Sequence, residues 1–345
     1  MRNMDRRHFL QLSGLGLAGL SLPGLLALRP AEDLVIGHGS YRYKIDVRWG
    51  RLNPERHPVK DCHEMVQDRQ GRLFLLTNHV RNNVLIYDTA GKLLESWGTT
   101  FPGAHGLTIH DEGGEEFLYI TDTERHTVTK TTLGGQVVLE IPFPQASGKY
   151  QRADQFKPTE TAIADNGDIF IADGYGEQYV LQYSAKGELI HLFGGKGNAE
   201  HQLGNAHGVC IDRRNPKDVH LLVTDRMANQ LKQYNLDGSF RGAIHLPGAY
   251  ICRPVIKDQN IYLATIWSGK GDQGTGFVSI LAAQNRLVSA PGGGNPVYEN
   301  DALQPMRQAM RLFVHPHDVC VDRDDNLYIP QWNAGQSYPI KLIRV

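Results

Sequence analysis

The chain has 345 residues, and its 36 lysine and arginine residues balance 37 aspartate and glutamate residues to a formal net charge of −1, which argues against a nucleic-acid-binding protein. A composition of 41% hydrophobic and 21% charged residues predicts a globular chain and excludes a disordered one. Four cysteines, Cys62, Cys210, Cys252 and Cys320, are too few for a disulfide-dense scaffold and lack zinc-knuckle spacing.

The first 35 residues form a predicted targeting segment. A charged start with the sequence Arg6-Arg7-His8-Phe9-Leu10 precedes a stretch rich in glycine and leucine at residues 12–28. The Arg-Arg-x-Phe-Leu core resembles the twin-arginine export signal. Polar residues, glycines and a proline interrupt the apolar stretch, whereas a permanent membrane helix needs roughly 20 apolar residues in a row. We therefore expect a signal peptide at residues 1–35, use of the twin-arginine export machinery, and a periplasmic or secreted mature protein without a membrane span. An ordinary N-terminal membrane helix is the alternative.

From residue 36 onward, one pattern recurs six times at intervals of about fifty residues. Each copy has a polar opening, an apolar strand, a turn containing Asp or Gly, and a second apolar strand. The copies begin at Cys62, His105, Thr159, His207, Pro254 and His317, of which the copy at Pro254 is the weakest. Several copies continue with a third and a fourth strand. Four short strands per unit are typical of a propeller blade. The sequence therefore predicts an all-β fold over residues 36–345: a six-bladed β-propeller with four-stranded antiparallel blades around a central channel.

The sixth copy provides only three strands before the chain ends. The segment at residues 41–47 alternates between polar and apolar residues, which is typical of a half-buried strand. We expect this N-terminal segment to supply the missing outer strand and to close the ring. Residues 300–312, ahead of the sixth copy, are predicted to form a short helix.

Three histidines open the first strand of alternate copies: His105, His207 and His317. First strands line the channel, and alternate blades of a six-bladed ring stand about 120° apart, so the three imidazoles should converge on the axis. Three neutral imidazoles with a free fourth position suit a catalytic zinc, although other divalent transition metals also accept imidazole. Copies one, three and five have Cys62, Thr159 and no histidine at that position. The alternative is that each histidine only caps its strand by hydrogen bonding.

Several short segments of the sequence resemble motifs of a known family. They are residues 102–107, residues 158–160 together with 171–175, residues 207–209 together with 224–226, and residues 316–319. These segments are similar to motifs of peptidylglycine α-amidating lyase, an NHL-repeat propeller, and the resemblance covers about residues 60–345. It implies that His105, His207 and His317 are zinc ligands. It also implies a catalytic tyrosine at Tyr175, an active-site arginine at Arg226, and a structural calcium held by Asp318 and the carbonyl of Leu107.

The family's second active-site arginine has no clean counterpart in the sequence. The aligned position is Asn78, with His79 and Arg81 nearby. These three residues are candidates for contacting substrate. Three further residues near the openings of first strands could orient the ligand imidazoles or contact substrate: His63, Glu64 and Glu160.

The family reaction cleaves a carbinolamide C–N bond and yields an amide and glyoxylate. The resemblance thus implies a zinc-dependent carbon–nitrogen lyase that acts on a small-molecule or peptide substrate. We expect this protein to be exported and to be a monomer. Tyr175 would be the base, and Arg226 offers a planar fork for a substrate carboxylate. The alternatives are a non-catalytic NHL propeller that serves as a protein- or ligand-binding platform, and a metal-dependent hydrolase similar to the lactonases.

Overall fold

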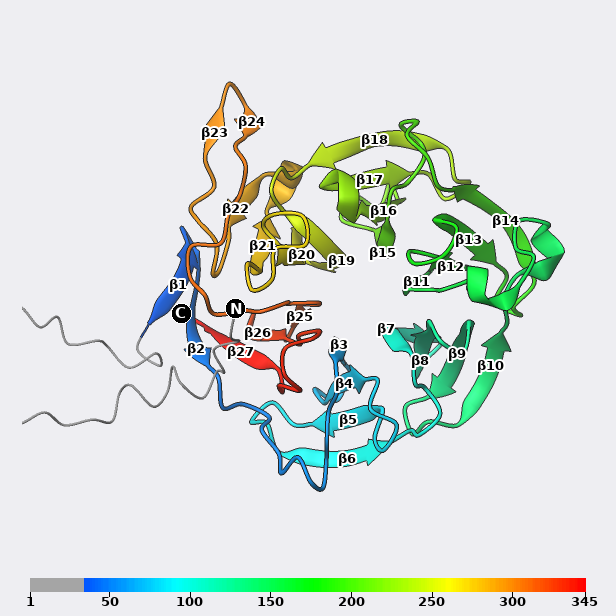
Figure 1. Cartoon of the computed structure of the whole chain (residues 1–345), viewed down its shortest axis with the longest axis horizontal. Helices are drawn as coiled ribbons and strands as arrows, with labels where there is room; N and C mark the ends of the chain where they lie inside the picture. Colours follow the sequence, from blue (N-terminus) through cyan, green and yellow to red (C-terminus); the bar gives the residue numbers. More distant parts are fainter. Residues whose placement is uncertain (1–33) are drawn as a thin grey trace, which may run out of the picture.

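The computed structural model describes residues 34–345 and arranges them as a ring of six antiparallel sheets (Figure 1). The six-bladed all-β prediction is confirmed. All of the predicted signal peptide except its last two residues lies outside the described part of the chain. Within residues 34–345, no helix is both long enough and apolar enough to cross a membrane.

Five blades are four-stranded and continuous in sequence. Blade one contains β3 (Cys62–Gln67), β4 (Leu73–Thr77), β5 (Val84–Tyr87) and β6 (Leu93–Trp97). Blade two contains β7 (Ala104–Glu112), β8 (Glu115–Asp122), β9 (Thr127–Thr132) and β10 (Val137–Ile141). Blade three contains β11 (Glu160–Ile163), β12 (Ile169–Ala172), β13 (Tyr179–Tyr183) and β14 (Leu189–Gly194). Blade four contains β15 (Ala206–Asp212), β16 (His220–Asp225), β17 (Gln230–Tyr234) and β18 (Phe240–His245). Blade five contains β19 (Tyr250–Lys257), β20 (Asn260–Trp267), β21 (Phe277–Leu281) and β22 (Leu287–Ser289).

Blade six is built from both ends of the described chain. Its inner strands are β25 (Cys320–Val321), β26 (Leu327–Ile329) and β27 (Ile340–Arg344). β2 (Tyr41–Asp46) pairs with β27, with Tyr43 opposite Arg344, and β1 (Val35–His38) adds a fifth strand outside β2. The predicted closure by the N-terminal segment is therefore confirmed, with two added strands rather than one. In Figure 1 the blue and red strands lie side by side in this blade.

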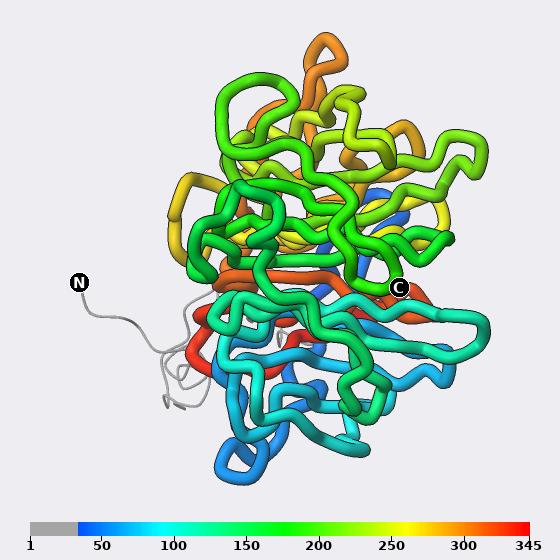
Figure 2. Tube along the Cα trace, turned by 90° about the vertical axis from the view of Figure 1, so that its right-hand side faces the viewer, coloured from blue at the N-terminus to red at the C-terminus, as the bar shows by residue number. Residues whose placement is uncertain are grey.

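The segment between blades five and six is a hairpin, so the helix predicted at residues 300–312 is wrong. β23 (Tyr298–Glu299) and β24 (Ala302–Leu303) pair across a turn formed by Asn300 and Asp301. Both turn residues have left-handed backbone angles, with φ of 47° and 63°, as a tight hairpin turn requires. This hairpin projects from the edge of the ring (Figure 2).

The hydrophobic core is divided among the six blade interfaces, with one cluster at each. Between blades one and two, for example, Phe74 and Ile86 pack with Leu107 and Ile120. Each blade buries both faces, and for that reason central strands such as β4 and β12 are buried along their whole length. The packed ring holds the innermost strands β3, β7, β11, β15, β19 and β25 around the centre (Figure 1).

Candidate metal centre

The innermost strand of four blades has a β-bulge at the same position. The register shifts between Cys62 and Glu64 in β3, between Ala104 and Leu107 in β7, between Ala206 and Val209 in β15, and between Ile251 and Pro254 in β19. A bulge breaks the regular alternation and re-aims a side chain. The first residues inside these bulges are His63, His105, His207 and Cys252.

This register places His63, and not Cys62, at the position of the expected metal ligands. Cys62 pairs with Thr77 in the way that Ala104 pairs with Asp122, so His63 is the equivalent of His105. The sequence pattern starts copy one at Cys62, which is one residue too early. The first blade therefore also contributes a histidine.

Four imidazoles meet at the centre of the ring. The ring centroid of His105 lies 4.7 Å from that of His317 and 4.9 Å from that of His207, and the centroids of His207 and His317 are 4.9 Å apart. The ring of His63 lies 4.7 Å from those of both His105 and His317. All four side chains are buried. The rings of His105, His207 and His317 thus lie together as the sequence predicts, and His63 joins them.

The donor atoms of this cluster fit a divalent transition metal. Nδ1 of His63, Nδ1 of His207 and Nε2 of His317 are buried without a hydrogen-bond partner. One donor atom from each of His63, His105 and His317 lies within 4.8 Å of the other two, and the same holds for His207, Cys252 and His317. Buried nitrogens are rarely left unpaired, so the cluster is arranged for a ligand that accepts lone pairs.

Backbone carbonyls fix the tautomers of two of the imidazoles. Nδ1 of His105 donates to the carbonyl of Thr159 at 2.8 Å, and Nδ1 of His317 donates to the carbonyl of His63 at 3.1 Å. The unprotonated nitrogen of each ring is then Nε2. Burial lowers the pKa of both histidines well below 6.5, which keeps the rings neutral.

Tyr175 reaches the cluster from the turn that follows β12. Its hydroxyl lies 3.2 Å from Nε2 of His105 and 3.0 Å from Nε2 of His207. The side chain is 43% exposed as a whole, yet this hydroxyl end is enclosed by the histidines. Burial raises the pKa of the phenol, and the positive charge of Arg226 opposes that shift. The sequence-predicted tyrosine therefore lies at the centre.

Arg226 directly follows β16 and is buried beside Tyr175. Its Nη2 donates to Sγ of Cys252 at 3.1 Å, and its Nε donates to the carbonyl of Ile251 at 3.3 Å. Within residues 34–345, no carboxylate forms an ion pair with this guanidinium. A buried cation without a carboxylate partner is suited to bind an anionic group of a ligand.

All four cysteines are free thiols.

The residues expected to hold calcium lie in the next layer of the channel and do not fit that ion. The carbonyl of Leu107 and the carboxylate of Asp318 lie close together, but both accept hydrogen bonds from the guanidinium of Arg253, at 2.6 and 2.8 Å. Glu64 and Glu160 face the same guanidinium at 3.2 and 3.6 Å. The oxygens expected to bind calcium are thus already occupied by an internal cation.

The three blade-one candidates for substrate contact stay apart from the imidazoles. Asn78 exchanges hydrogen bonds with Asp61 at 3.0 and 3.1 Å. Arg81 is exposed and donates to the carbonyl of Glu55, and its backbone nitrogen approaches Nδ1 of His79. In the described part of the chain, no hydrogen bond or ring contact joins Asn78, His79 or Arg81 to the imidazoles of the four histidines.

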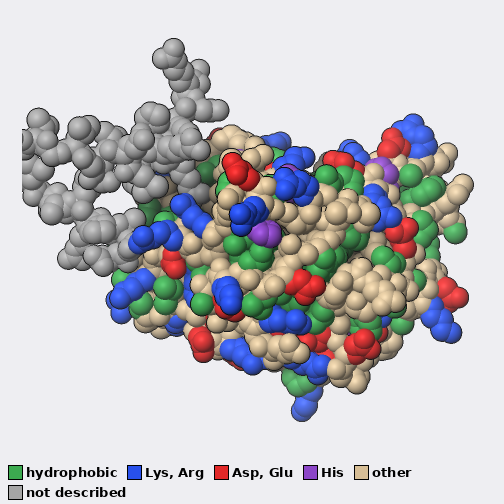
Figure 3. Space-filling model, turned by 90° about the horizontal axis from the view of Figure 1, so that it is seen from below, with side chains coloured by type: hydrophobic (Ala, Val, Ile, Leu, Met, Phe, Trp, Pro, Cys, Tyr) green, Lys and Arg blue, Asp and Glu red, His purple; other side chains and the backbone are tan. Residues whose placement is uncertain are grey.

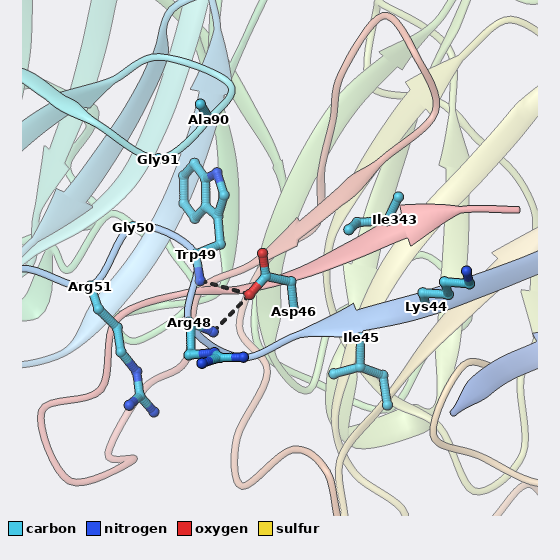
Figure 4. A pocket seen from close by; sticks show the side chains of 10 residues that line it. All are labelled: Lys44, Ile45, Asp46, Arg48, Trp49, Gly50, Arg51, Ala90, Gly91 and Ile343. Carbon is cyan, nitrogen blue, oxygen red and sulfur yellow. Dashed lines mark hydrogen bonds between the residues drawn. The ribbon is translucent and has the colours of Figure 1, made fainter. Parts of the chain in front are cut away.

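Two surface pockets also lie away from the centre. One, of about 420 Å³, is at the seam where the N-terminal strand closes the ring; there Asp46 accepts hydrogen bonds from the backbone nitrogens of Arg48 and Trp49 (Figure 4). The other, of about 630 Å³, lies between residues 197–204 and 225–245. Neither contains one of the four histidines. Charges of both signs are interspersed over the face seen in Figure 3.

No family model matches the chain. It is similar to peptidyl-alpha-hydroxyglycine alpha-amidating lyase 1 of Drosophila melanogaster, with 40% identity over 111 residues, 30% of this chain and 19% of that protein. It is 30% identical to peptidyl-glycine alpha-amidating monooxygenase A of Xenopus laevis over 262 residues, 74% of this chain and 26% of that protein. Human NHL repeat-containing protein 3 is 25% identical over 210 residues, 58% of this chain and 59% of that protein. The chain thus spans less than a third of the length of the two amidating relatives.

Solved structures with the same architecture include a streptogramin B lyase, with a TM-score of 0.55 and 12% identity over 83% of this chain and 94% of that one. Virginiamycin B lyase from Staphylococcus aureus has a TM-score of 0.53 and 11% identity, with 83% of this chain and 96% of that one covered. At such identities these structures show the fold alone. The chain is a six-bladed β-propeller whose homologues include proteins named peptidyl-alpha-hydroxyglycine alpha-amidating lyase and NHL repeat-containing protein.

Proposed function

We propose that this protein is a metal-dependent lyase that cleaves a carbinolamide-type C–N bond and releases glyoxylate or a similar carbonyl acid. The observation that carries the proposal is the hydroxyl of Tyr175, held between His105 and His207 and beside the unpaired cation of Arg226. The names of the amidating relatives support the same class of reaction.

The metal in this proposal is zinc or another divalent transition metal, held by imidazoles of the cluster formed by His63, His105, His207 and His317. Bound there, such an ion would act as a Lewis acid on the substrate hydroxyl. Its ligands are neutral imidazoles, so they do not cancel its charge.

Tyr175 and Arg226 have distinct roles in this proposal. The guanidinium of Arg226 binds the substrate carboxylate through two parallel N–H donors, which fixes the carbinol carbon beside the phenol. In its phenolate form, which the positive charges of Arg226 and of a bound metal would favour against burial, Tyr175 accepts the proton of the substrate hydroxyl. The C–O bond then gains double-bond character, the C–N bond breaks, and the proton taken up by Tyr175 passes to the leaving nitrogen, which completes the amide and restores the phenolate.

The direct test is elemental analysis of the purified protein followed by an assay with benzoyl-α-hydroxyglycine. We expect about one transition-metal ion per chain and the release of benzamide and glyoxylate in equal amounts. Removal of the metal should abolish the release of both products. A protein that binds metal but releases no glyoxylate contradicts the lyase, and lactone hydrolysis would then favour the hydrolase alternative. A protein without metal or turnover would favour the binding platform.

We also propose that the protein acts outside the cytoplasm, because its N-terminal sequence has the twin-arginine pattern at Arg6 and Arg7. A separate proposal is that the exported form is a monomer. Replacement of both arginines by lysine should retain the chain in the cytoplasm, as cell fractionation would show. Light scattering of the exported form should give the mass of a single chain, and a mass twice as large would contradict the monomer.

A further inference from the structure

Arg253 is the residue after Cys252 in the bulge of β19, and its guanidinium lies buried at the centre of the ring. It donates from Nη1 to the carbonyl of Leu107 at 2.6 Å and from Nη2 to the carbonyl of Met65 at 3.1 Å. It also binds both carboxylate oxygens of Asp318, at 3.1 and 2.8 Å. One side chain from blade five thus contacts the innermost strands of blades one and two and the residue that follows His317 in blade six.

The carboxylates around Arg253 are themselves held by further donors. The backbone nitrogen of Met65 donates to Asp318 at 3.0 Å, and that of Leu107 donates to Glu64 at 2.6 Å. The hydroxyl of Thr108 and the backbone nitrogen of Thr161 donate to Glu160 at 2.9 and 2.8 Å. These bonds hold the carboxylates in place around the guanidinium.

The other two blades make room for this arrangement with glycine. Gly106 and Gly208 directly follow the histidines of blades two and four, at the place where the other four blades carry Glu64, Glu160, Arg253 and Asp318. A Cβ on Gly208 would lie 2.7 Å from Cα of Arg253, and one on Gly106 would lie 3.0 Å from Cα of Glu160. Any larger residue would push the charged layer apart.

We infer that Arg253 takes the place of a structural calcium ion, so that this propeller folds and holds its inner strands together without calcium. Calcium binds carboxylate and carbonyl oxygens, and a guanidinium presents five N–H donors to the same kinds of oxygen. The carbonyl of Leu107 and the carboxylate of Asp318, which the family resemblance assigns to calcium, are both bound by Arg253. The inference does not depend on the proposed lyase activity.

The test compares the melting temperatures of the wild-type protein and of Arg253→Ala. Both proteins are first treated with EGTA and then measured with and without added calcium. The wild-type protein should contain no calcium, and its melting temperature should not change when calcium is added. Arg253→Ala should melt roughly 5–10 °C lower, because it leaves buried carboxylates without their cation. Calcium should then raise the melting temperature of this variant in a saturable manner, because the ion can enter the space that the guanidinium left.

Two controls make the test specific. Arg253→Ala combined with Asp318→Asn should lose the response to calcium, because a carboxylate of the ion's site is gone. Arg241→Ala removes an arginine that pairs with Asp218 on an outer strand, and it should not respond to calcium. Calcium in the wild-type protein, or a fall in its melting temperature with EGTA that calcium reverses, would overturn the inference. If Arg253→Ala does not fold, this wild-type measurement still decides the question.

Discussion

Two adjacent layers of the channel are made by consecutive residues and behave in opposite ways. In the imidazole layer, His63, His207 and His317 each keep a buried nitrogen without a partner. In the layer of Glu64 and Asp318, the guanidinium of Arg253 supplies the positive charge. The difference teaches that a ring of inward-facing polar residues is not by itself a metal site. A metal site needs donors that the protein leaves free, whereas oxygens that an internal cation already binds, as Arg253 binds both oxygens of Asp318, indicate a structural role.

The most severe test of this distinction is His207→Ala. We expect weaker metal binding and a fall in activity of at least about 10³-fold, because the proposed metal site loses one imidazole and the hydroxyl of Tyr175 loses one partner. Elemental analysis and the glyoxylate assay measure both effects. Full activity with bound metal would remove His207 from the ligand set.

Tyr175→Phe should separate chemistry from metal binding. The metal content should stay near that of the wild-type protein, while kcat falls about 10²–10⁴-fold, because the variant lacks the oxygen that accepts the proton. Steady-state kinetics together with elemental analysis checks this expectation. An unchanged kcat would assign the proton transfer to another group.

His63→Gln tests the histidine that the repeat alignment missed. We expect metal affinity to fall about 10–100-fold with the metal still bindable, because the other three imidazoles remain. Competition titration with a chromophoric chelator gives the affinity. Asn78→Ala is the matched control in the same blade, and it should leave the affinity unchanged. Equal affinities for both variants would show that His63 does not act on the metal.

The smallest expected effect concerns the pH dependence of the metal-free protein. Burial, followed by the charges of Lys60 and Arg226, lowers the pKa of His63 to about 3, against about 6.5 in the unfolded chain. Between these values only the unfolded chain binds the proton, so stability falls as the pH drops below 6.5. His63→Gln removes this contribution, and its free energy of unfolding should fall about 1 kcal/mol less than that of the wild type between pH 7 and 5.5. Urea unfolding of both proteins at the two pH values measures this difference. If the wild type and His63→Gln lose the same free energy of unfolding, the lowered pKa of His63 is contradicted.

The sequence was sufficient to predict the fold and the three alternate histidines because both follow from a repeat with a fixed period. The order of residues did not reveal the bulges, which shift the register by one residue and bring His63 into the centre. The sequence pattern did not reveal Arg253, because it placed the start of copy five at Pro254, two residues after Cys252, the equivalent of His105. The calcium prediction matched Leu107 and Asp318 but could not show that a side chain from another blade occupies the space between them.

The pairing of β2 with β27 joins segments almost a full chain length apart. Contacts between such distant segments form slowly, because a long loop must close before they contribute stability. His63 and His317 lie on the two blades that meet where the ring shuts, with Nδ1 of His317 bonded to the carbonyl of His63. We therefore expect the imidazole cluster to be completed only when β2 pairs with β27, and metal uptake during refolding to proceed at the rate of that pairing.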